Sequence, residues 1–484
     1  MTREEQVILV DEKDRPQGTA EKMEAHRKGL LHRAFSVFLF NDEGKLLLQR
    51  RAKGKYHSGG LWTNTVCSHP MPGEDTRAAA IRRLKEEMGI EAEVHKIFDF
   101  IYRAELDNGL TEHEFDHVFI GKFNGKPELN PEEADDYRYM HLQEIREDIR
   151  RHPGQYTAWF KIIFEKSWDA LLREAGKMFR HEALVFEPYF EEKIWGGDKL
   201  KTFFGKPVPS PHTGESWEVS AVPGKESRVR DGFFKGLDLR ELWNVLGEDY
   251  FGKLEEKDFP LLVKYIDARA DLSVQVHPGD ELARRRHGGF GKNETWYILD
   301  AEPESRLYLG FKPGTTKEDY LAALKNGTVE ELLNAVPVKP GDWYYVPAGT
   351  VHAIGKGIFL AEIQQSSDIT YRIYDYNRWD KDGRMRPLHI EEALEAIRFD
   401  AKPEKVENDR LHTPYFSVEK IPGGKNIPYN APHFAIVLNP YDNALKINDK
   451  FLKKGDTALL FAHETYMISG NMPWFLVEAG NGFM

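Results

Sequence analysis

The sequence WTNTVCSHP, residues 62–70, decides how the N-terminal part of the chain is interpreted. It contains Cys67, the only cysteine among 484 residues, and His69 follows two positions later. Most free cysteines are small, buried hydrophobic side chains. Here a basic stretch at residues 50–55 precedes the thiol, and a thiol near cationic groups is a candidate acid, base or nucleophile.

Strand-like and helical segments alternate around this stretch, which predicts an α/β fold for residues 1–168. Strands are expected at residues 7–10, 35–40, 46–49, 96–103 and 114–123. A helix is expected at 75–88, with Asp75 or Thr76 as its N-cap and Gly89 directly after its end. A second amphipathic segment at 153–177 grades into charged residues, so residues 169–183 are expected to form a linker.

From about residue 184, glycine and proline become frequent and short β runs follow one another closely. Strands are expected at residues 215–220, 261–266, 272–277, 294–299, 342–346, 358–364 and 370–374, with helical insertions at 316–324 and 389–399. Short strands with Gly and Pro turns predict a mainly-β sandwich or barrel at 184–400. Further runs at 434–438 and 457–461 predict a smaller β unit, without a metal site, at 401–484.

Composition excludes several classes of protein. Lys and Arg number 67 and Asp and Glu number 79, so the net charge is −12, which argues against nucleic acid as a partner. Apolar runs such as residues 34–40 are far shorter than the roughly 20 residues of a membrane span, and we find no signal-peptide core. One cysteine excludes a disulfide framework. We expect a cytoplasmic, multi-domain protein with no membrane partner, and the oligomeric state stays open.

Histidines and carboxylates in the N-terminal block have the pattern of a metal site. Glu112 and Glu114 share one face of an expected strand, where two carboxylates repel each other unless a cation lies between them. His26, His32 and His69 would complete a site of three nitrogen and two oxygen ligands, which suits Mn²⁺, Zn²⁺ or Mg²⁺. Each histidine by itself would more often be a solvated surface residue, but the set together favours a metal.

Residues 68–90 resemble a degenerate Nudix box, a motif that holds metals on a diphosphate. The matching positions are Glu74, Arg82, Glu86, Glu87, Gly89 and Ile90. Ser68 replaces the first glycine of the box and Arg83 replaces its first glutamate, which argues against hydrolysis of a diphosphate. Ion pairs four residues apart on a helix surface would also account for the charges at 82–87.

Together with the Arg50-Arg51 pair, YRA at 102–104, EHE at 112–114 and Trp159, these motifs make residues 1–168 resemble type 1 isopentenyl-diphosphate isomerase, a Nudix-fold enzyme. The resemblance implies that Cys67 and Glu114 transfer protons while the double bond of isopentenyl diphosphate moves. The implied ligands are His26, His32, His69, Glu112 and Glu114 for Mn²⁺ or Zn²⁺, and Glu87 for Mg²⁺. The implied substrate contacts are Arg51, Lys55, Arg83, Tyr102 and Trp159, the last as an aromatic face for a carbocation.

The C-terminal block carries a second set of metal-binding side chains. In LSVQVHPGD, residues 272–280, Gln275 and His277 point to the same face of an expected strand. Glu294 follows in the next strand, and His352 comes after a Pro-Ala-Gly turn, like the second cupin motif. Two imidazoles, a carboxylate and an amide oxygen make a plausible Zn²⁺ site with an open position.

These segments resemble type I mannose-6-phosphate isomerase, a cupin enzyme with a double-stranded β-helix, or jelly roll. FPLLVKYIDA at 259–268, EIQQSSDITYR at 362–372 and WGG at 195–197 also carry the resemblance. It implies Zn²⁺ on Gln275, His277, Glu294 and His352, with Arg372 and Asp368 as catalytic residues and Lys264 and Lys292 as substrate contacts. The general base stays open.

The fold class expected for the whole chain is a Nudix α/β domain followed by a mainly-β cupin. The expected function is a bifunctional isomerase acting on two small molecules, isopentenyl diphosphate and mannose 6-phosphate. The alternative is an N-terminal Nudix diphosphatase joined to a non-catalytic cupin that binds a sugar phosphate. Cys67, with its predicted partner Glu114, speaks against the first half of that alternative, and the complete ligand set with Arg372 speaks against the second.

Overall fold

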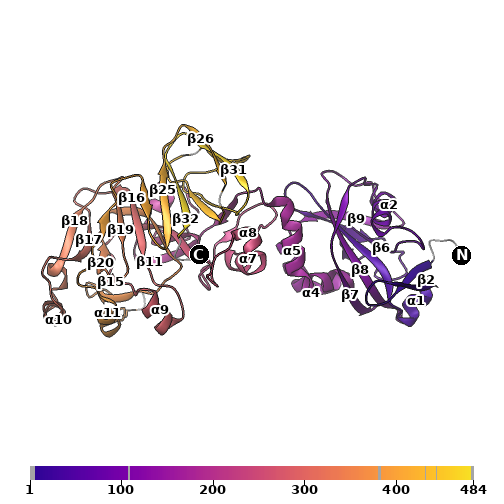
Figure 1. Cartoon of the computed structure of the whole chain (residues 1–484), viewed down its shortest axis with the longest axis horizontal. Coiled ribbons are helices and arrows are strands. Elements are labelled where there is room, and N and C mark those ends of the chain that lie inside the picture. Colours follow the sequence, from indigo (N-terminus) through magenta and orange to yellow (C-terminus); the bar gives the residue numbers. More distant parts are fainter. Residues whose placement is uncertain (1–5, 107–108, 380–382, 431, 443, 481–484) are drawn as a thin grey trace. The chain divides into compact units, whose positions relative to one another are not determined.

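The computed structural model describes residues 6–106, 109–379, 383–430, 432–442 and 444–480. The chain divides into two compact units (Figure 1). Unit 1 comprises Met1–Arg180 and Asp231–Leu237, and unit 2 comprises His181–Arg230 and Asp238–Met484. Among the described residues, no helix has the length and apolar character that crossing a membrane requires.

Unit 1 is built on a nine-stranded mixed sheet. Its strands are β1 (Gln6–Val10), β2 (Pro16–Glu21), β3 (His32–Phe40), β4 (Leu46–Arg51), β5 (Trp62–Thr63), β6 (Val66–Ser68), β7 (Val94–Glu105), β8 (Thr111–Lys122) and β9 (Ala134–Met140). Strand β3 pairs in parallel with β8 and antiparallel with β1, β4 and β6. The five strands that we expected in this block are confirmed as β1, β3, β4, β7 and β8.

Helix α2 (Thr76–Met88) covers one face of this sheet. The Asp75 side chain accepts a hydrogen bond from the backbone N–H of Ala78, and Gly89 ends the helix with a φ of 64°, which confirms the expected caps. The apolar stripe of α2 packs on apolar side chains of β3 in one buried core; its members include Phe35, Val37, Leu39, Ala79, Ala80, Leu84 and Met88. This packing fixes the side of the helix that carries Glu87.

The residues expected to form a linker, 169–183, contain most of a helix. The other helices of unit 1 are α1 (Lys22–Lys28), α3 (Leu142–Arg151), α4 (Ala158–Lys166) and α5 (Trp168–Gly176), with 3₁₀ turns at Pro153–Gln155 and Lys177–Phe179. In α5, Leu171, Leu172 and Ala175 are buried, and α4 and α5 lie beside β7 (Figure 1). Residues 169–180 are therefore part of the fold of unit 1, because the apolar stripe of α5 is covered, and unit 2 begins at His181.

The short segment 231–237 belongs to unit 1 through two aromatic side chains. Phe233 and Phe234 are each 1% exposed. The Phe233 ring stacks on Phe179 with centroids 4.8 Å apart and meets the Phe40 ring edge-on at 5.3 Å. Gly44 permits this approach, since a Cβ at Gly44 would lie 2.3 Å from Cα of Phe233. A piece of the sequence that we assigned to the cupin block is thus core of unit 1.

Two antiparallel sheets form the cupin part of unit 2. The seven-stranded sheet consists of β11 (Tyr189–Gly197), β12 (Thr213–Val219), β14 (Leu261–Ala268), β21 (Ile358–Gln365), β16 (Glu294–Ala301), β19 (Trp343–Val346) and β23 (Glu404–Lys405). The five-stranded sheet consists of β18 (Leu333–Pro337), β17 (Arg306–Phe311), β20 (His352–Ile354), β15 (Val274–Val276) and β22 (Tyr371–Tyr374). A shared apolar core that includes Trp296, Ile298, Leu307 and Leu309 joins the two sheets.

The remaining strands of unit 2 form two further sheets. One consists of β13 (Arg228–Val229), β10 (Leu184–Glu187), β30 (Thr457–Leu460), β27 (Ala435–Leu438), β32 (Trp474–Ala479), β25 (Phe416–Ile421) and β24 (Arg410–His412). The other consists of β26 (Lys425–Asn430), β31 (Thr465–Gly470), β28 (Leu445–Ile447) and β29 (Lys450–Leu452). Strand β10 pairs with β30, and β23 pairs with β19, so the blocks expected at 184–400 and 401–484 exchange strands.

Helices of unit 2 lie between the strands at the expected insertions and elsewhere. They are α6 (Lys199–Thr202), α7 (Leu239–Leu246), α8 (Glu248–Phe251), α9 (Asp280–His287), α10 (Lys317–Asn326) and α11 (Ile390–Ala396), with a 3₁₀ turn at Val329–Leu332. Helices α10 and α11 confirm the two predicted insertions. In α10, Thr316 and Asp319 form a capping box, which explains why the helix begins there.

Candidate active sites

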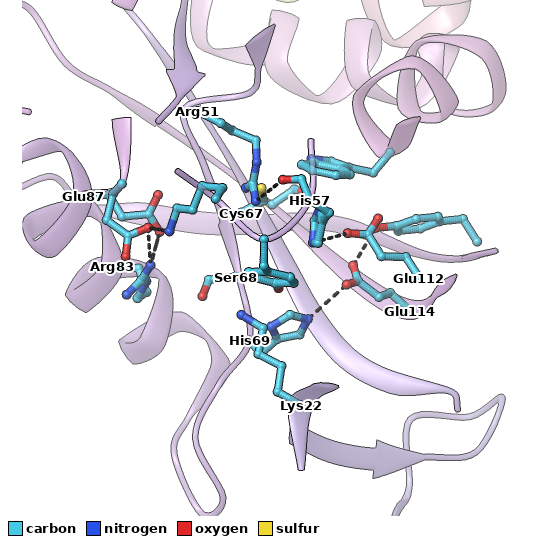
Figure 2. Close-up of a pocket in the computed structure, with 16 residues that line it drawn as sticks. Lys22, Arg51, His57, Cys67, Ser68, His69, Arg83, Glu87, Glu112 and Glu114 are labelled. Atoms are coloured by element: carbon cyan, nitrogen blue, oxygen red, sulfur yellow. Dashed lines mark hydrogen bonds and ion pairs between the residues drawn. The ribbon is translucent and has the colours of Figure 1, made fainter. Parts of the chain in front are cut away.

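The pocket of unit 1, whose lining residues are drawn in Figure 2, forms where β3, β6 and β8 run side by side. The register places Ser36 of β3 opposite Cys67 of β6, and His32 of β3 opposite Glu114 of β8. His69 follows directly after β6, and His26 lies in the last turn of α1. Because β3 lies between β6 and β8, it brings side chains that are distant in the sequence to one place.

Four of the five predicted ligands of unit 1 form one group. The ligand atoms of His26, His32, His69 and Glu114 lie within 4.8 Å of one another. Nε2 of His69 lies 3.2 Å from Nε2 of His32 and 3.0 Å from Oε1 of Glu114. Burial lowers the pKa of His26, and it lowers the pKa of His69 to about 3. Both rings are therefore neutral near pH 7, which is the form that binds metals.

Backbone carbonyls set the tautomers of two of these rings. Nδ1 of His26 lies 2.7 Å from the carbonyl oxygen of Lys22, and Nδ1 of His32 lies 2.8 Å from that of Leu30. Each Nδ1 must carry the hydrogen, which leaves a lone pair on each Nε2. Nε2 of His26 is buried and has no hydrogen-bond partner among the described residues. These lone pairs, together with the Glu114 carboxylate, fit a divalent cation.

Glu112, the fifth predicted ligand, reaches the pocket but falls in a different group. Its ligand atom lies within 4.8 Å of those of His26 and His57. The Tyr102 hydroxyl lies 3.0 Å from Oε2 of Glu112 and 2.6 Å from Oε2 of Glu114, so it sits between the two carboxylates. Burial and the neighbouring charge of Glu114 raise the pKa of Glu112 well above its usual range.

The predicted diphosphate contacts line the same pocket. Lys55 forms an ion pair with Glu133, and Arg83 lies 3.3 Å from Glu133 and 2.7 Å from the buried Glu87. The Arg51 guanidinium lies 5.2 Å from the centre of the Trp159 ring. These three cations lie along the pocket from α2 to its aromatic side, and two of them are paired with Glu133.

The thiol of Cys67 lies in this pocket in its protonated form. Burial raises the pKa of Cys67 well above its usual value, and this outweighs the opposite influence of Arg51. Glu112 and Glu114 act in the same direction as burial. A protonated thiol and a nearby carboxylate pair are suited to moving protons on and off a substrate.

The pocket of unit 2 lies between the two cupin sheets. Gln275 on β15 and His352 on β20 face each other in the five-stranded sheet, while Lys264, Glu294 and Glu362 come from β14, β16 and β21 of the seven-stranded sheet. The ligand atoms of His277, Glu294 and His352 lie within 4.8 Å of one another. The amide nitrogen of Gln275 lies 3.3 Å from Nε2 of His352, so the four predicted ligands are brought together.

The tautomers in unit 2 are set in the same way as in unit 1. Nδ1 of His277 lies 2.9 Å from the carbonyl oxygen of Ile369, and Nδ1 of His352 lies 2.9 Å from that of Thr350. Nε2 of His352 therefore presents a lone pair to Oε1 of Glu294, 3.3 Å away. Two acceptors face each other across this gap, an arrangement that a cation would stabilise. Burial lowers the pKa of His352 to about 3, so the ring is neutral.

Two lysines and two further carboxylates surround this group. Nζ of Lys292 lies 2.9 Å from Oε2 of Glu294, 3.0 Å from Nε2 of His277 and 3.4 Å from Oε1 of Glu362. Burial raises the pKa of Glu362 to about 7. Burial also raises the pKa of Glu215, but the charges of Lys193 and Lys264 outweigh it and hold the value at about 2.

Arg372 and Asp368, the predicted catalytic pair, both line the pocket. Among the described residues, no hydrogen bond or ion pair joins these two side chains. Nη1 of Arg372 donates to the carbonyl oxygen of Pro387 at 3.0 Å, and its buried Nε has no partner among the described residues. Asp368 is 46% exposed at its side chain and lies 3.4 Å from Nζ of Lys225. The bond to Pro387 thus holds the guanidinium in place, and Nε remains available to donate a hydrogen bond to a substrate.

Comparison with known proteins assigns both parts of the chain. Residues 30–160 match the Nudix domain family, and residues 184–309 match the catalytic domain of type I phosphomannose isomerase. Isopentenyl-diphosphate Delta-isomerase 2 of Aromatoleum aromaticum is 54% identical over 163 residues, which are 34% of this chain and 86% of that protein. Mannose-6-phosphate isomerase of Bacillus subtilis is 42% identical over 296 residues, which are 58% of this chain and 93% of that protein. The chain belongs to both isomerase families.

The fold supports the second membership as well. The crystal structure of mannose 6-phosphate isomerase from Bacillus subtilis superposes with a TM-score of 0.55 at 34% sequence identity and covers 61% of this chain and 99% of that chain. The predicted residues of the isopentenyl-diphosphate isomerase part all line its pocket or belong to its four-membered ligand group. In the mannose-6-phosphate isomerase part, the predicted residues likewise line the pocket or belong to the group of His277, Glu294 and His352.

Several pocket residues were missed from the sequence. In the isopentenyl-diphosphate isomerase part they are Lys22, Tyr56, His57 and Glu133, and in the mannose-6-phosphate isomerase part they are Lys193, Glu215, Lys225, Glu362 and Arg386. Lys22 lies four residues before His26 on α1, a spacing that points to a shared helix face. Glu362 had no such local signal, because it meets Lys264 only through the pairing of β14 with β21.

Proposed function

We propose that the chain is a bifunctional isomerase. Unit 1 converts isopentenyl diphosphate to dimethylallyl diphosphate, and unit 2 converts mannose 6-phosphate to fructose 6-phosphate. The observation that carries the proposal is that each part covers most of the length of an isomerase relative and gathers that family's polar residues around one pocket.

In unit 1 the reaction adds a proton to C4 of isopentenyl diphosphate and removes one from C2, so the carbon skeleton and the charge are unchanged. Of Cys67 and Glu114, one gives the proton to C4 and the other takes the proton from C2, and a return transfer of one proton between the two groups restores the enzyme before the next turnover. Arg51, Lys55 and Arg83 bind the diphosphate. The intermediate is a tertiary carbocation, which the face of Trp159 stabilises while the buried pocket excludes water.

In unit 2 the proton on C2 of the open-chain sugar moves to C1, and the hydroxyl proton on O2 moves to O1. Glu362 carries the carbon-bound proton, because it is buried in the pocket and bound mainly by Lys292. Glu215, the other buried carboxylate, is engaged by the indole N–H of Trp217 at 2.7 Å and by Lys193 at 3.3 Å. Arg372 donates hydrogen bonds to the developing enediolate oxygen.

Both units use divalent metals in this proposal. His26, His32, His69, Glu112 and Glu114 hold Mn²⁺ or Zn²⁺, Glu87 helps to hold Mg²⁺ on the diphosphate, and Gln275, His277, Glu294 and His352 hold Zn²⁺. A bound cation supplies a positive charge that polarises substrate oxygens and offsets the carboxylates. Support comes from the facing lone pairs and buried carboxylates of both groups.

The test is to assay the full-length protein with both substrates and with a Glu362→Gln variant. The wild type should turn over both. Glu362→Gln should lower kcat for mannose 6-phosphate by roughly 10²–10⁴-fold, the usual contribution of a proton-transfer group, without altering isopentenyl diphosphate turnover. Lys356→Gln, an exposed-loop substitution in unit 2, is the matched control. Absence of either activity in metal-loaded wild type would contradict the proposal for that unit.

A further inference from the structure

His57 is a buried side chain in the pocket of unit 1, on the loop between β4 and β5 (Figure 2). Its Nε2 lies 3.7 Å from Oε1 of Glu112, and its Nδ1 lies 3.2 Å from the hydroxyl of Ser58. Its ring meets the Trp159 ring edge-on at 5.8 Å. The Arg51 guanidinium donates to the carbonyl oxygen of His57 at 3.4 Å, so the loop is tied to the end of β4.

In the ionised form that would bind a metal, the Glu112 carboxylate needs a hydrogen-bond donor. Tyr102 has a single hydroxyl hydrogen, yet its oxygen lies near one oxygen of Glu112 and one of Glu114, at 3.0 and 2.6 Å. The shorter contact assigns that hydrogen to Glu114. The other oxygen of Glu112 faces His57. Within the pocket, His57 is thus placed to satisfy this carboxylate.

We propose that His57 is a positioning residue for Glu112. In the tautomer that this role requires, the Ser58 hydroxyl donates to Nδ1 of His57 and the hydrogen lies on Nε2, which faces Oε1 of Glu112. The 3.7 Å between Nε2 and Oε1 is longer than a hydrogen bond, so the positioning role requires this gap to close when a cation is bound, with the N–H then holding the carboxylate toward His26 and the metal-binding group. The inference rests on the metal-dependent isomerase proposed for unit 1.

The same ring links Glu112 to the aromatic wall of the pocket. One edge of His57 points at the carboxylate, and the ring packs against Trp159. The group of His26, His57 and Glu112 shares His26 with the group of His26, His32, His69 and Glu114, so Glu112 lies beside that group. His57 therefore decides whether the metal site of unit 1 has four protein ligands or five.

The experiment measures Mn²⁺ binding to the full-length protein by electron paramagnetic resonance, without substrate. All variants carry His352→Ala, so that the ligand group of unit 2 does not compete. His57→Leu keeps the approximate volume but has no donor, and His57→Gln places an amide N–H near the position of Nε2. His95→Leu, an exposed histidine on β7, is the matched control.

We expect His57→Leu to bind Mn²⁺ about 10-fold or more weakly, the effect usual for a residue that orients a ligand. His57→Gln should stay within about threefold of the parent and His95→Leu should not differ from it. Unchanged affinity in His57→Leu would overturn the proposal. Equal weakening in His57→Leu and His57→Gln would also overturn it, because His57 would then be a ligand itself.

Melting of the metal-free variants reports folding independently of metal. Where His57→Leu does not fold, His57→Asn takes its place, because its shorter amide cannot reach Glu112; affinity equal to that of His57→Gln would then contradict the proposal. Since no substrate is present, a His57-dependent affinity in a protein that does not isomerise isopentenyl diphosphate would reject the proposed function and leave the positioning role standing.

Discussion

The two candidate metal-binding groups of the chain differ in the charges that surround their carboxylates. In both, backbone carbonyls bind Nδ1 of two histidines, His26 and His32 in unit 1 and His277 and His352 in unit 2, and turn their Nε2 lone pairs inward. In unit 2 the chain supplies its own cation, because Nζ of Lys292 lies 2.9 Å from Glu294 and 3.0 Å from His277. In unit 1 two carboxylates, Glu112 and Glu114, share the hydroxyl of Tyr102.

This difference predicts that the two groups depend on a bound cation to different extents. The carboxylate of unit 2 is partly neutralised by lysine even without a cation, whereas the carboxylate pair of unit 1 repels itself until a cation or a proton intervenes. In the proposed reactions the two units also use different proton carriers, a thiol with a carboxylate in unit 1 and the carboxyl group of Glu362 in unit 2. The sharpest tests are therefore substitutions that affect one unit and spare the other.

The largest effect is expected from removing a histidine ligand of unit 2. His352→Ala should lose the unit 2 metal and reduce mannose 6-phosphate turnover to background, because one of two imidazole ligands is gone. Isopentenyl diphosphate turnover in the same sample should stay at the level of the wild type. Metal content by elemental analysis, together with both activities, checks this. Full mannose 6-phosphate turnover in metal-free protein would contradict this prediction, because unit 2 would then need no metal for its activity.

The second test replaces the thiol of unit 1. Cys67→Ala should lower isopentenyl diphosphate turnover by roughly 10²–10⁴-fold, since one proton-transfer group is lost, and should leave mannose 6-phosphate turnover unchanged. The measurement is kcat for both substrates on one preparation. A variant that keeps more than about a tenth of the wild-type rate would show that Cys67 takes no part in the proton transfers.

The third test asks whether Arg372 acts on the transition state or on the fold. Arg372→Lys keeps the charge but loses the planar fork of donors, so kcat for mannose 6-phosphate should fall by roughly 10²-fold with little change in metal content. Rates are normalised to folded, metal-loaded protein. A normal kcat on that scale, with lower thermal stability, would assign Arg372 to the barrel wall through its bond to Pro387.

Much of this arrangement could be predicted from local sequence. The capping residues of the helix at 76–88 can be recognised directly before and after it in the sequence. The alternation of side chains in LSVQVHP places Gln275 and His277 on one face of the strand. Strand spacing pointed to Glu112 with Glu114 and to Gln275 with His277, and the resemblance to the two isomerase families implied the complete ligand sets. What could not be predicted depends on pairing between distant strands, such as Lys264 of β14 opposite Glu362 of β21.

The boundaries between the two units also could not be predicted from local sequence patterns. The charged stretch near residue 175 has the composition of a linker, yet its apolar stripe is buried in α5. Strand β10 pairs with β30, which lies almost three hundred residues later in the sequence. Tertiary packing, and not the local sequence, brings these two strands together. The segment 231–237 likewise gives no sign in its own sequence that Phe233 packs within unit 1.

The smallest effect is expected for a substitution in the segment 231–237. This substitution tests whether a residue belongs to a unit through its position in the sequence or through its packing. Phe233→Leu keeps an apolar side chain but removes the stacked contact with Phe179, and such aromatic pairs contribute about 0.5–1.5 kcal/mol beyond their buried area. A loss of about 1 kcal/mol should lower the midpoint temperature for thermal unfolding of unit 1 by roughly 2–4 °C.

Each activity reports its own unit, so both are measured after heating one sample through a series of temperatures. The midpoint for loss of isopentenyl diphosphate turnover should fall, although residue 233 lies inside the mannose isomerase sequence, and the midpoint for mannose 6-phosphate turnover should stay. Phe451→Leu, at a position 62% exposed on β29, is the control and should move neither. If the mannose activity alone became less stable, Phe233 would belong energetically to unit 2, and the assignment of 231–237 by its aromatic contacts would be wrong.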